Sequence, residues 1–176
     1  EMIILDGGLG RELKAMGAPF RQPEWSALAL MEGPDFVRAA HDAFIEAGAD
    51  IITTNSYAIV PFHIGEAAFR NRAGELLDLA GQLAKSAANS SQHPVQVAGG
   101  VPPMFGSYQP DKFDAGRASE MMALFRRHLT PYVDVFMAET HSSIAEARCF
   151  LDAFADCGKP VWLSLTLEDA EPIVGQ

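Results

Sequence analysis

The sequence predicts an α/β fold built around a parallel sheet. Short apolar runs rich in Val and Ile alternate along the chain with longer stretches of helical periodicity. The short runs contain almost no polar residues, which is typical of strands buried on both faces of a parallel sheet. Regular alternation of strand and helix is typical of consecutive βα units. The 176 residues, of which 48% are hydrophobic, suffice for one domain with a substantial core.

Five strands are expected from the apolar runs. They lie at residues 2–5, 51–54, 95–98, 133–138 and 161–165. A doubly wound sheet could be complete with five strands, whereas a (β/α)8 TIM barrel needs about 250 residues. In the second case the chain would hold only about the first five βα units of the barrel.

Four long helices are expected between the strands. They lie at about residues 33–48, 65–88, 117–129 and 143–158. Pro34 stands in the first turn of the first helix and Gly48 closes it, which are residue types favoured at those positions. Ser143 and Glu146 have the capping-box spacing at the start of the fourth helix, in which each side chain accepts a hydrogen bond from the other residue's free backbone N–H.

The charge balance argues against two classes of partner. The 13 Lys and Arg residues against 23 Asp and Glu residues give a formal net charge of −10. Nucleic acids and anionic membranes attract clustered positive charge, so neither is expected as a partner. No apolar run approaches the roughly 18–20 residues of a membrane-spanning helix, and residues 1–5 do not resemble a signal peptide. A cytoplasmic protein is therefore expected.

The cysteines and histidines give no metal-binding pattern. Cys149 and Cys157 are too few for a disulfide scaffold and have no histidine beside them, so two reduced thiols are expected rather than a zinc pair. His41 and His128 fall inside helical patterns and are expected to be surface or packing residues. His141 follows the fourth expected strand and is a lone candidate for acid–base chemistry.

Polar residues follow the expected strands at the edge where parallel α/β folds bind ligands. Asp6 follows the first strand, Thr54 and Asn55 end the second, and Glu139 follows the fourth. Asp6 could instead be a turn or N-cap residue of the helix that follows. Glu139 directly continues an apolar strand, so it is expected to be at least partly buried and to need a partner, either an internal Arg or a ligand ammonium. These groups suit a zwitterionic small molecule without identifying a reaction.

The same segments resemble the homocysteine S-methyltransferase family, which are zinc-dependent (β/α)8 barrels. The matching segments are ILDGGLGREL (4–13), PEWSA (23–27), GADIITTNSY (48–57), AGGVPP (98–103), DVFMAET (134–140) and KPVWLS (159–164). The resemblance implies that residues 1–176 are a partial homocysteine-binding TIM-barrel domain. It also implies transfer of a methyl group from a cationic donor, namely S-methylmethionine, S-adenosylmethionine or betaine, to the zinc-bound thiolate of homocysteine, which gives methionine.

The resemblance also assigns roles to individual residues. Asp6 and the backbone of Gly7 match positions at the homocysteine site, and Thr54 matches a hydroxyl that lines it. Glu139 matches the carboxylate that holds the substrate amino group. Asn55 and Tyr57 are expected on the same rim.

The family's zinc is held by three cysteines that have no counterpart in this sequence. The ligands are therefore expected beyond residue 176, and no catalytic or metal-ligating residue is assigned within the chain. The alternative is a non-catalytic partial barrel that acts as a binding or assembly module, because open sheet edges invite pairing with another chain. The oligomeric state stays open.

Overall fold

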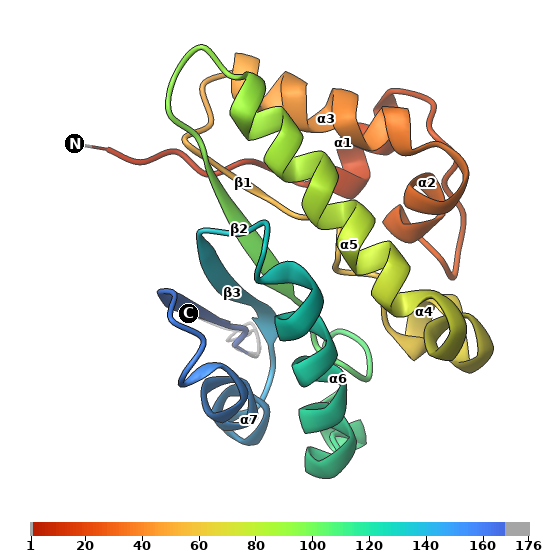
Figure 1. Ribbon diagram of the computed structural model, residues 1–176. Helices are drawn as coiled ribbons and strands as arrows, with labels where there is room; N and C mark the ends of the chain where they lie inside the picture. The colour runs from red at the N-terminus through yellow and green to blue at the C-terminus, as the bar shows by residue number, and fades with distance from the viewer. Residues whose placement is uncertain (1, 168–176) are drawn as a thin grey trace, which may run out of the picture.

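The protein contains one four-stranded parallel sheet, seen in a computed structural model that describes residues 2–167 (Figure 1). The strands are β1 (Ile51–Thr53), β2 (Gln96–Val101), β3 (Val135–His141) and β4 (Val161–Leu165). Each pairs in parallel with the next one along the chain, with Ile52 opposite Val97 and Gly99 opposite Phe136.

The strand order distinguishes the two expected architectures. A doubly wound sheet reverses its order at a switch point, whereas the order here is β1-β2-β3-β4 without a reversal. Each new strand is added on the same side of the one before it, as in the wall of a (β/α)8 barrel. The expected fold class, an α/β partial TIM barrel, is therefore confirmed.

The first expected strand, at residues 2–5, does not form, and this prediction was wrong. This segment runs beside β1, but it pairs only through an isolated bridge between Leu5 and Ile51. The N–H of Ile4 donates to the Asp50 carboxylate at 2.8 Å, so a side chain accepts the bond that a neighbouring strand would accept in a ladder. With β1 only three residues long, the pairing does not extend into a strand.

Helices cover one face of the sheet. They are α1 (Leu9–Ala15), α2 (Ser26–Glu32), α3 (Pro34–Glu46), α4 (Pro61–Ile64), α5 (Glu66–Ser90), α6 (Ala115–Leu129) and α7 (Ile144–Phe154), with a 3-10 turn at Pro110–Lys112. In Figure 1 α5 lies between α3 and α6, and α7 packs beside α6. The four long helices are confirmed within a few residues at each end. None of the described helices is long and apolar enough to cross a membrane.

The predicted capping box of α7 forms only in part. The Ser143 hydroxyl accepts a hydrogen bond from the Glu146 N–H at 3.1 Å, as expected. The Glu146 carboxylate, however, accepts from the N–H of Ser142 at 3.3 Å instead of from Ser143.

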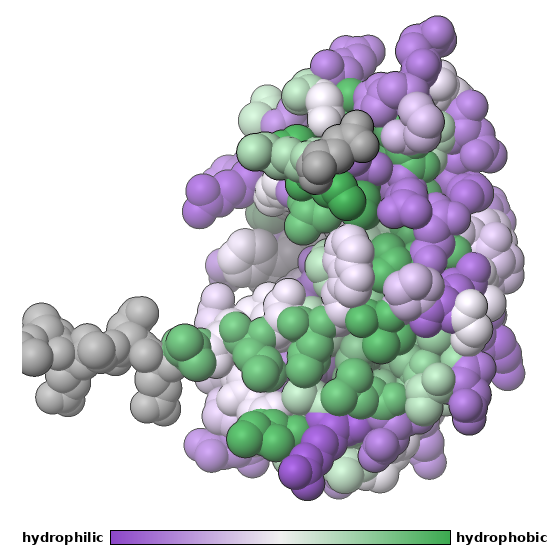
Figure 2. Space-filling view, turned by 90° about the vertical axis from the view of Figure 1, so that its left-hand side faces the viewer, coloured by the Kyte–Doolittle hydropathy of each residue, from purple (hydrophilic) through white to green (hydrophobic). Residues whose placement is uncertain are grey.

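Apolar side chains are exposed at both ends of the sheet. Beside β1 they are Met2, Ile3, Ile4 and Leu5, and on or just after β4 they are Trp162, Leu163, Leu165 and Leu167. Figure 2 faces the left-hand side of Figure 1 and shows green apolar surface gathered there. By contrast, large side chains between the sheet and the helices, such as Phe125, Phe136 and Phe150, are fully buried. This contrast is what a barrel wall open along one side would present.

Candidate functional site

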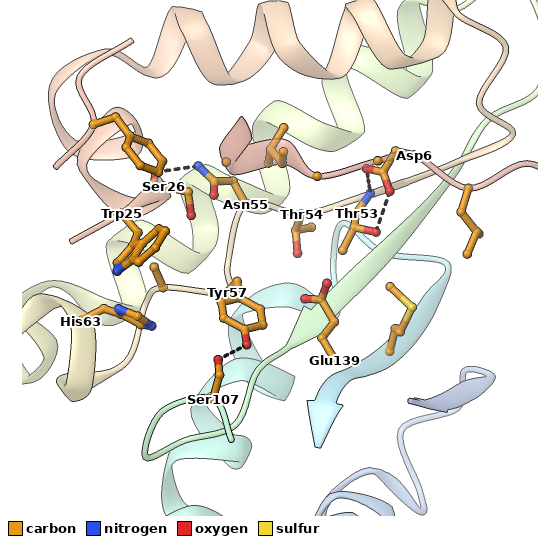
Figure 3. A pocket seen from close by; sticks show the side chains of 18 of the residues that line it. Asp6, Trp25, Ser26, Thr53, Thr54, Asn55, Tyr57, His63, Ser107 and Glu139 are labelled. Carbon is orange, nitrogen blue, oxygen red and sulfur yellow. Dashed lines mark hydrogen bonds between the residues drawn. The ribbon is translucent and has the colours of Figure 1, made fainter. Parts of the chain in front are cut away.

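A cavity of about 570 Å³ lies at the carboxyl ends of β1 and β3 (Figure 3). All five predicted site residues line it, namely Asp6, Gly7, Thr54, Asn55 and Glu139. Residues from the N-terminal loop, the β1 end, the start of α2 and the loop after β2 complete the wall. The edge of the sheet at which the sequence predicted ligand binding therefore holds a cavity of a size that suits a small molecule.

Asp6 is held on one side of the cavity by Thr53. One carboxylate oxygen accepts the Thr53 backbone N–H at 2.7 Å, and the other accepts the Thr53 hydroxyl at 3.1 Å. Burial raises the pKa of Asp6 to about 6, although the hydrogen bonds from Thr53 oppose that rise. Asp6 is not the N-cap of α1, because Gly8 occupies that position. Its carboxylate is instead fixed toward the cavity.

Glu139 faces the same cavity from β3 (Figure 3). Its Oε2 atom is buried and has no hydrogen-bond partner among the described residues. Burial, and then the negative charge of Asp6, raise the pKa of Glu139 to about 7. The expected burial is confirmed. Of the two partners considered, an internal Arg does not pair with this carboxylate within residues 2–167.

Gly100 on β2 leaves the space that the Glu139 carboxylate occupies. A β-carbon at Gly100 would overlap Oε2 of Glu139, and it would also lie 3.1 Å from the methyl group of Thr53. The sequence placed this glycine at a strand end but gave no sign of its contact with Glu139.

Thr54 and Asn55 use their polar groups within the cavity wall. The Thr54 oxygen lies 2.7 Å from the Ser56 hydroxyl and accepts the Gly100 N–H at 3.1 Å, and Thr54 is only 3% exposed. The Asn55 amide nitrogen donates to the Ser26 carbonyl at 3.0 Å, which ties the β1 end to α2. Thr53, which the sequence reading did not select, is the threonine that contacts Asp6.

One wall of the cavity is aromatic. The Trp25 ring meets Phe20 edge to face, with ring centres 5.8 Å apart, and it meets His63 at 6.4 Å. Tyr57 lies beside them, and its hydroxyl hydrogen-bonds the Ser107 hydroxyl. Nδ1 of His63 lies 2.9 Å from the Pro23 carbonyl oxygen, and burial lowers the pKa of this histidine. Phe20 and His63 were not predicted, because nothing in their local sequence indicates that loop and helix meet here.

The remaining candidates lie elsewhere. His141 is fully buried and does not line the cavity, so its expected place at the site is wrong. His41 is buried inside the helical layer, and His128 contacts Asp78, so both are packing residues as expected. Cys149 and Cys157 are free thiols. Within residues 2–167, no three His, Cys, Asp or Glu side chains group as metal ligands would.

Comparison with known proteins points to one family. The family model for homocysteine S-methyltransferase matches residues 3–176. Homocysteine S-methyltransferase 3 from Zea mays is 29% identical over 98% of this chain, and selenocysteine methyltransferase from Astragalus bisulcatus is 28% identical over 97%. The metallated form of the homocysteine methyltransferase MmuM from Escherichia coli superposes with a TM-score of 0.79 at 26% identity, covering 96% of this chain. The chain spans 58% and 60% of the two plant proteins and 65% of the bacterial one.

Proposed function

The chain belongs to the homocysteine S-methyltransferase family, and we propose that the protein transfers a methyl group from a cationic donor to the sulfur of homocysteine, giving methionine. The observation that carries this proposal is the pair of carboxylates, the half-buried Asp6 and Glu139 with its buried Oε2 atom, in a cavity where no described cation neutralises them. Two such carboxylates favour a positively charged ligand group, and an amino acid supplies one as its ammonium.

The proposed homocysteine pose follows from the hydrogen bonds already present. Thr53 fixes the Asp6 carboxylate, while Oε2 of Glu139 is free to accept a new donor. The ammonium would lie between them and replace part of the hydration that burial has removed from both carboxylates. The two carboxylates would thus orient the amino acid end and hold the sulfur at a defined place in the cavity.

The aromatic wall supports the proposal of a cationic donor. Trp25 and Tyr57 line the same cavity as the carboxylate pair, and Tyr57 lies between Trp25 and Glu139 in Figure 3. Aromatic faces attract cations, most strongly where water is excluded. S-methylmethionine, S-adenosylmethionine and betaine all carry the transferred methyl on a positively charged sulfur or nitrogen. As the new carbon–sulfur bond forms, the bond between the donor's sulfur or nitrogen and the methyl group breaks, and its electron pair stays on the donor, which loses its positive charge. The homocysteine sulfur reacts as the thiolate, after its proton has been released to solvent.

Zinc is proposed as cofactor on the family resemblance alone. When bound, the metal would supply a deprotonated homocysteine sulfur at neutral pH. The residues of this chain do not fit such a site, because the described part has no group of three suitable ligands. Its proposed ligands therefore lie outside residues 2–167, and the contribution of this chain is to bind and orient the substrates.

A methyl-transfer assay tests the function. The protein that carries this sequence, expressed from its natural gene, should form methionine from homocysteine with at least one of the three donors. Trp25→Leu should raise the KM for the donor about tenfold and leave the KM for homocysteine within about twofold, because it removes a cation–π face but keeps apolar bulk. Phe36→Ala, on the outer helix α3, is the matched control and should change neither value. Absence of methionine with every donor would contradict the proposal.

The alternative function is a non-catalytic partial barrel that acts as a binding or assembly module. The apolar side chains exposed at residues 2–5 and along β4 favour it, because they form a surface on which another chain could pack. Under this alternative the protein would bind homocysteine but form no methionine, so the same assay separates the two. The lack of nucleic-acid or membrane partners stays a prediction from the net charge of −10, and a cytoplasmic location stays a prediction from the apolar runs and the first residues of the sequence.

A further inference from the structure

The strand that carries Glu139 changes direction immediately after it. In β3, Met137 and Glu139 line the cavity, whereas Phe136 and Ala138 belong to the core beneath the helices. Strict alternation would send residue 141 into the cavity as well. His141 instead lies fully buried against Phe150 of α7, with ring centres 5.7 Å apart.

The reversal coincides with one extra residue in the strand. Ala138 pairs with Leu163 of β4 and His141 pairs with Leu165, so two residues of β3 lie opposite one residue of β4. Thr140, one of these two, has φ of 59°, the left-handed region that a β-branched residue rarely adopts. Bulges of this kind redirect a side chain next to a site, and left-handed non-glycine residues persist only where the surrounding structure holds them.

The far end of the bulge is fixed by contacts outside the cavity. Nε2 of His141 lies 3.3 Å from the Val101 carbonyl oxygen at the end of β2. The carbonyl oxygen of His141 accepts the Thr166 N–H at 2.9 Å. His141 therefore joins the ends of β2, β3 and β4 to helix α7.

We propose that Thr140 and His141 are positioning residues for Glu139: the left-handed Thr140 turns the strand, and the buried His141 ring anchors it, so that the Glu139 carboxylate is held toward Asp6. This inference rests on the proposed function, in which Glu139 binds the amino group of homocysteine. Neither residue touches the substrate in this account. Their effect is confined to the direction and rigidity of the Glu139 side chain.

The test measures recognition of the amino group alone. In the protein expressed from its natural gene, dissociation constants are compared for homocysteine and for 4-mercaptobutyrate, which is homocysteine without its amino group. Thr140→Pro excludes positive φ and should lower the preference for homocysteine about tenfold or more. Thr140→Gly adopts positive φ freely and should keep the preference within about twofold of the wild type.

His141→Ala provides an independent variant if Thr140→Pro does not fold. It removes the ring anchor and should also lower the preference about tenfold. Phe154→Leu is the packing control, because Phe154 contacts Phe136 and Phe150 in the same core without contacting the bulge. It should lower the melting temperature and leave the preference unchanged.

The outcomes separate this inference from the proposed function. A wild-type protein that binds both ligands equally would contradict the ammonium site itself. A wild type that prefers homocysteine, together with a folded Thr140→Pro or His141→Ala that keeps the full preference, would overturn only the positioning role. If His141→Ala and Phe154→Leu lowered the preference for homocysteine equally, the effect would come from general loosening of the core. This result would also overturn the positioning role.

Discussion

The two carboxylates in the cavity are supported in opposite ways. Asp6 comes from a loop and accepts two hydrogen bonds from Thr53. Glu139 comes from a strand, yet its Oε2 atom has no partner among the described residues. The loop residue is thus fixed by direct bonds to its carboxylate, whereas the strand residue is fixed only through its backbone. Under the proposed function, Asp6 would be prepared before a ligand arrives, whereas Glu139 would obtain its partner from the ligand.

The pKa values follow the same division. Burial raises the pKa of Asp6 to about 6 and that of Glu139 to about 7, and the hydrogen bonds from Thr53 limit the rise at Asp6. Near neutral pH the pair without ligand therefore retains part of one proton. A bound ammonium would favour the ionised form of both groups.

The largest expected effect on homocysteine binding comes from substitution of Glu139, the carboxylate without a partner among the described residues. Glu139→Gln should raise the dissociation constant for homocysteine about 100-fold, or ~2.7 kcal/mol, because the ammonium loses its buried counter-charge. Asp6→Asn should raise the dissociation constant by a smaller factor, because the Thr53 N–H can still donate to the amide oxygen and hold the side chain in place. Titration calorimetry measures both. Glu146→Gln is the matched control, since Glu146 is buried outside the cavity. A larger loss of homocysteine affinity for Asp6→Asn than for Glu139→Gln would mean that Asp6, and not Glu139, is the main partner of the ammonium.

The same substitution should stabilise the protein without ligand. A carboxyl group whose pKa is raised by folding stabilises the fold fully below its unfolded pKa, and that stability is lost as pH rises through the folded value. For Glu139 this window runs from about 4.5 to about 7. Glu139→Gln should therefore be more stable than the wild type at pH 8 by about 3 kcal/mol, with the difference vanishing near pH 4.

Denaturant unfolding at several pH values measures this difference. His41 and His141 act in the opposite direction, because burial lowers the pKa of each to about 4 and stability is then lost as pH falls. Both histidines are present in wild type and variant, so their effect cancels in the difference curve. A difference independent of pH would mean that Glu139 is ionised at no cost in the fold.

The sequence predicted Glu139 better than the residues that support the site. An apolar run from 133 to 138 that continues into a carboxylate implies burial of that carboxylate whatever the fold. The choice between Thr53 and Thr54 depends instead on which side chain at the end of a three-residue strand faces Asp6, and neighbouring threonines give no periodic signal. The place of His141 depends on a bulge at Thr140, a residue type that rarely adopts positive φ, so its position after an expected strand did not show that its side chain turns into the core.

The fold shows the same limit. The long helices have capping residues and a repeating apolar face, and both were readable. In α2 the residues from Ser26 to Leu30 are buried one after another, so no amphipathic period marks the helix. The segment 2–5 is as apolar as a strand, but it forms only an isolated bridge, and the Ile4 N–H donates to the Asp50 side chain 46 residues away. Contacts at such separation have no local sequence pattern.

Two neighbouring threonines should separate binding from stability. Thr53→Val removes the hydroxyl bond to Asp6 and keeps the backbone one, so the dissociation constant for homocysteine should rise about fivefold, or ~1 kcal/mol. Thr54→Val leaves the buried Gly100 N–H without an acceptor and should lower the unfolding free energy by about 1–3 kcal/mol. Calorimetry measures the dissociation constant of both variants, and denaturant unfolding measures their unfolding free energy. If Thr54→Val weakened binding more than Thr53→Val, Thr54 rather than Thr53 would be the threonine that contacts the ligand site.

The smallest expected effect tests how freely Glu139 can move. In Gly100→Ala the new methyl group would overlap Oε2, but this oxygen is the end of a flexible side chain and can move aside. The unfolding free energy should therefore change by less than about 0.5 kcal/mol, while the dissociation constant for homocysteine rises about threefold because the carboxylate leaves its position opposite Asp6. Gly116→Ala on α6, where a β-carbon has only ordinary contacts, is the control. If Gly100→Ala instead destabilised the fold and left binding intact, Glu139 would be held as rigidly as Asp6, and the contrast between the two carboxylates would fail.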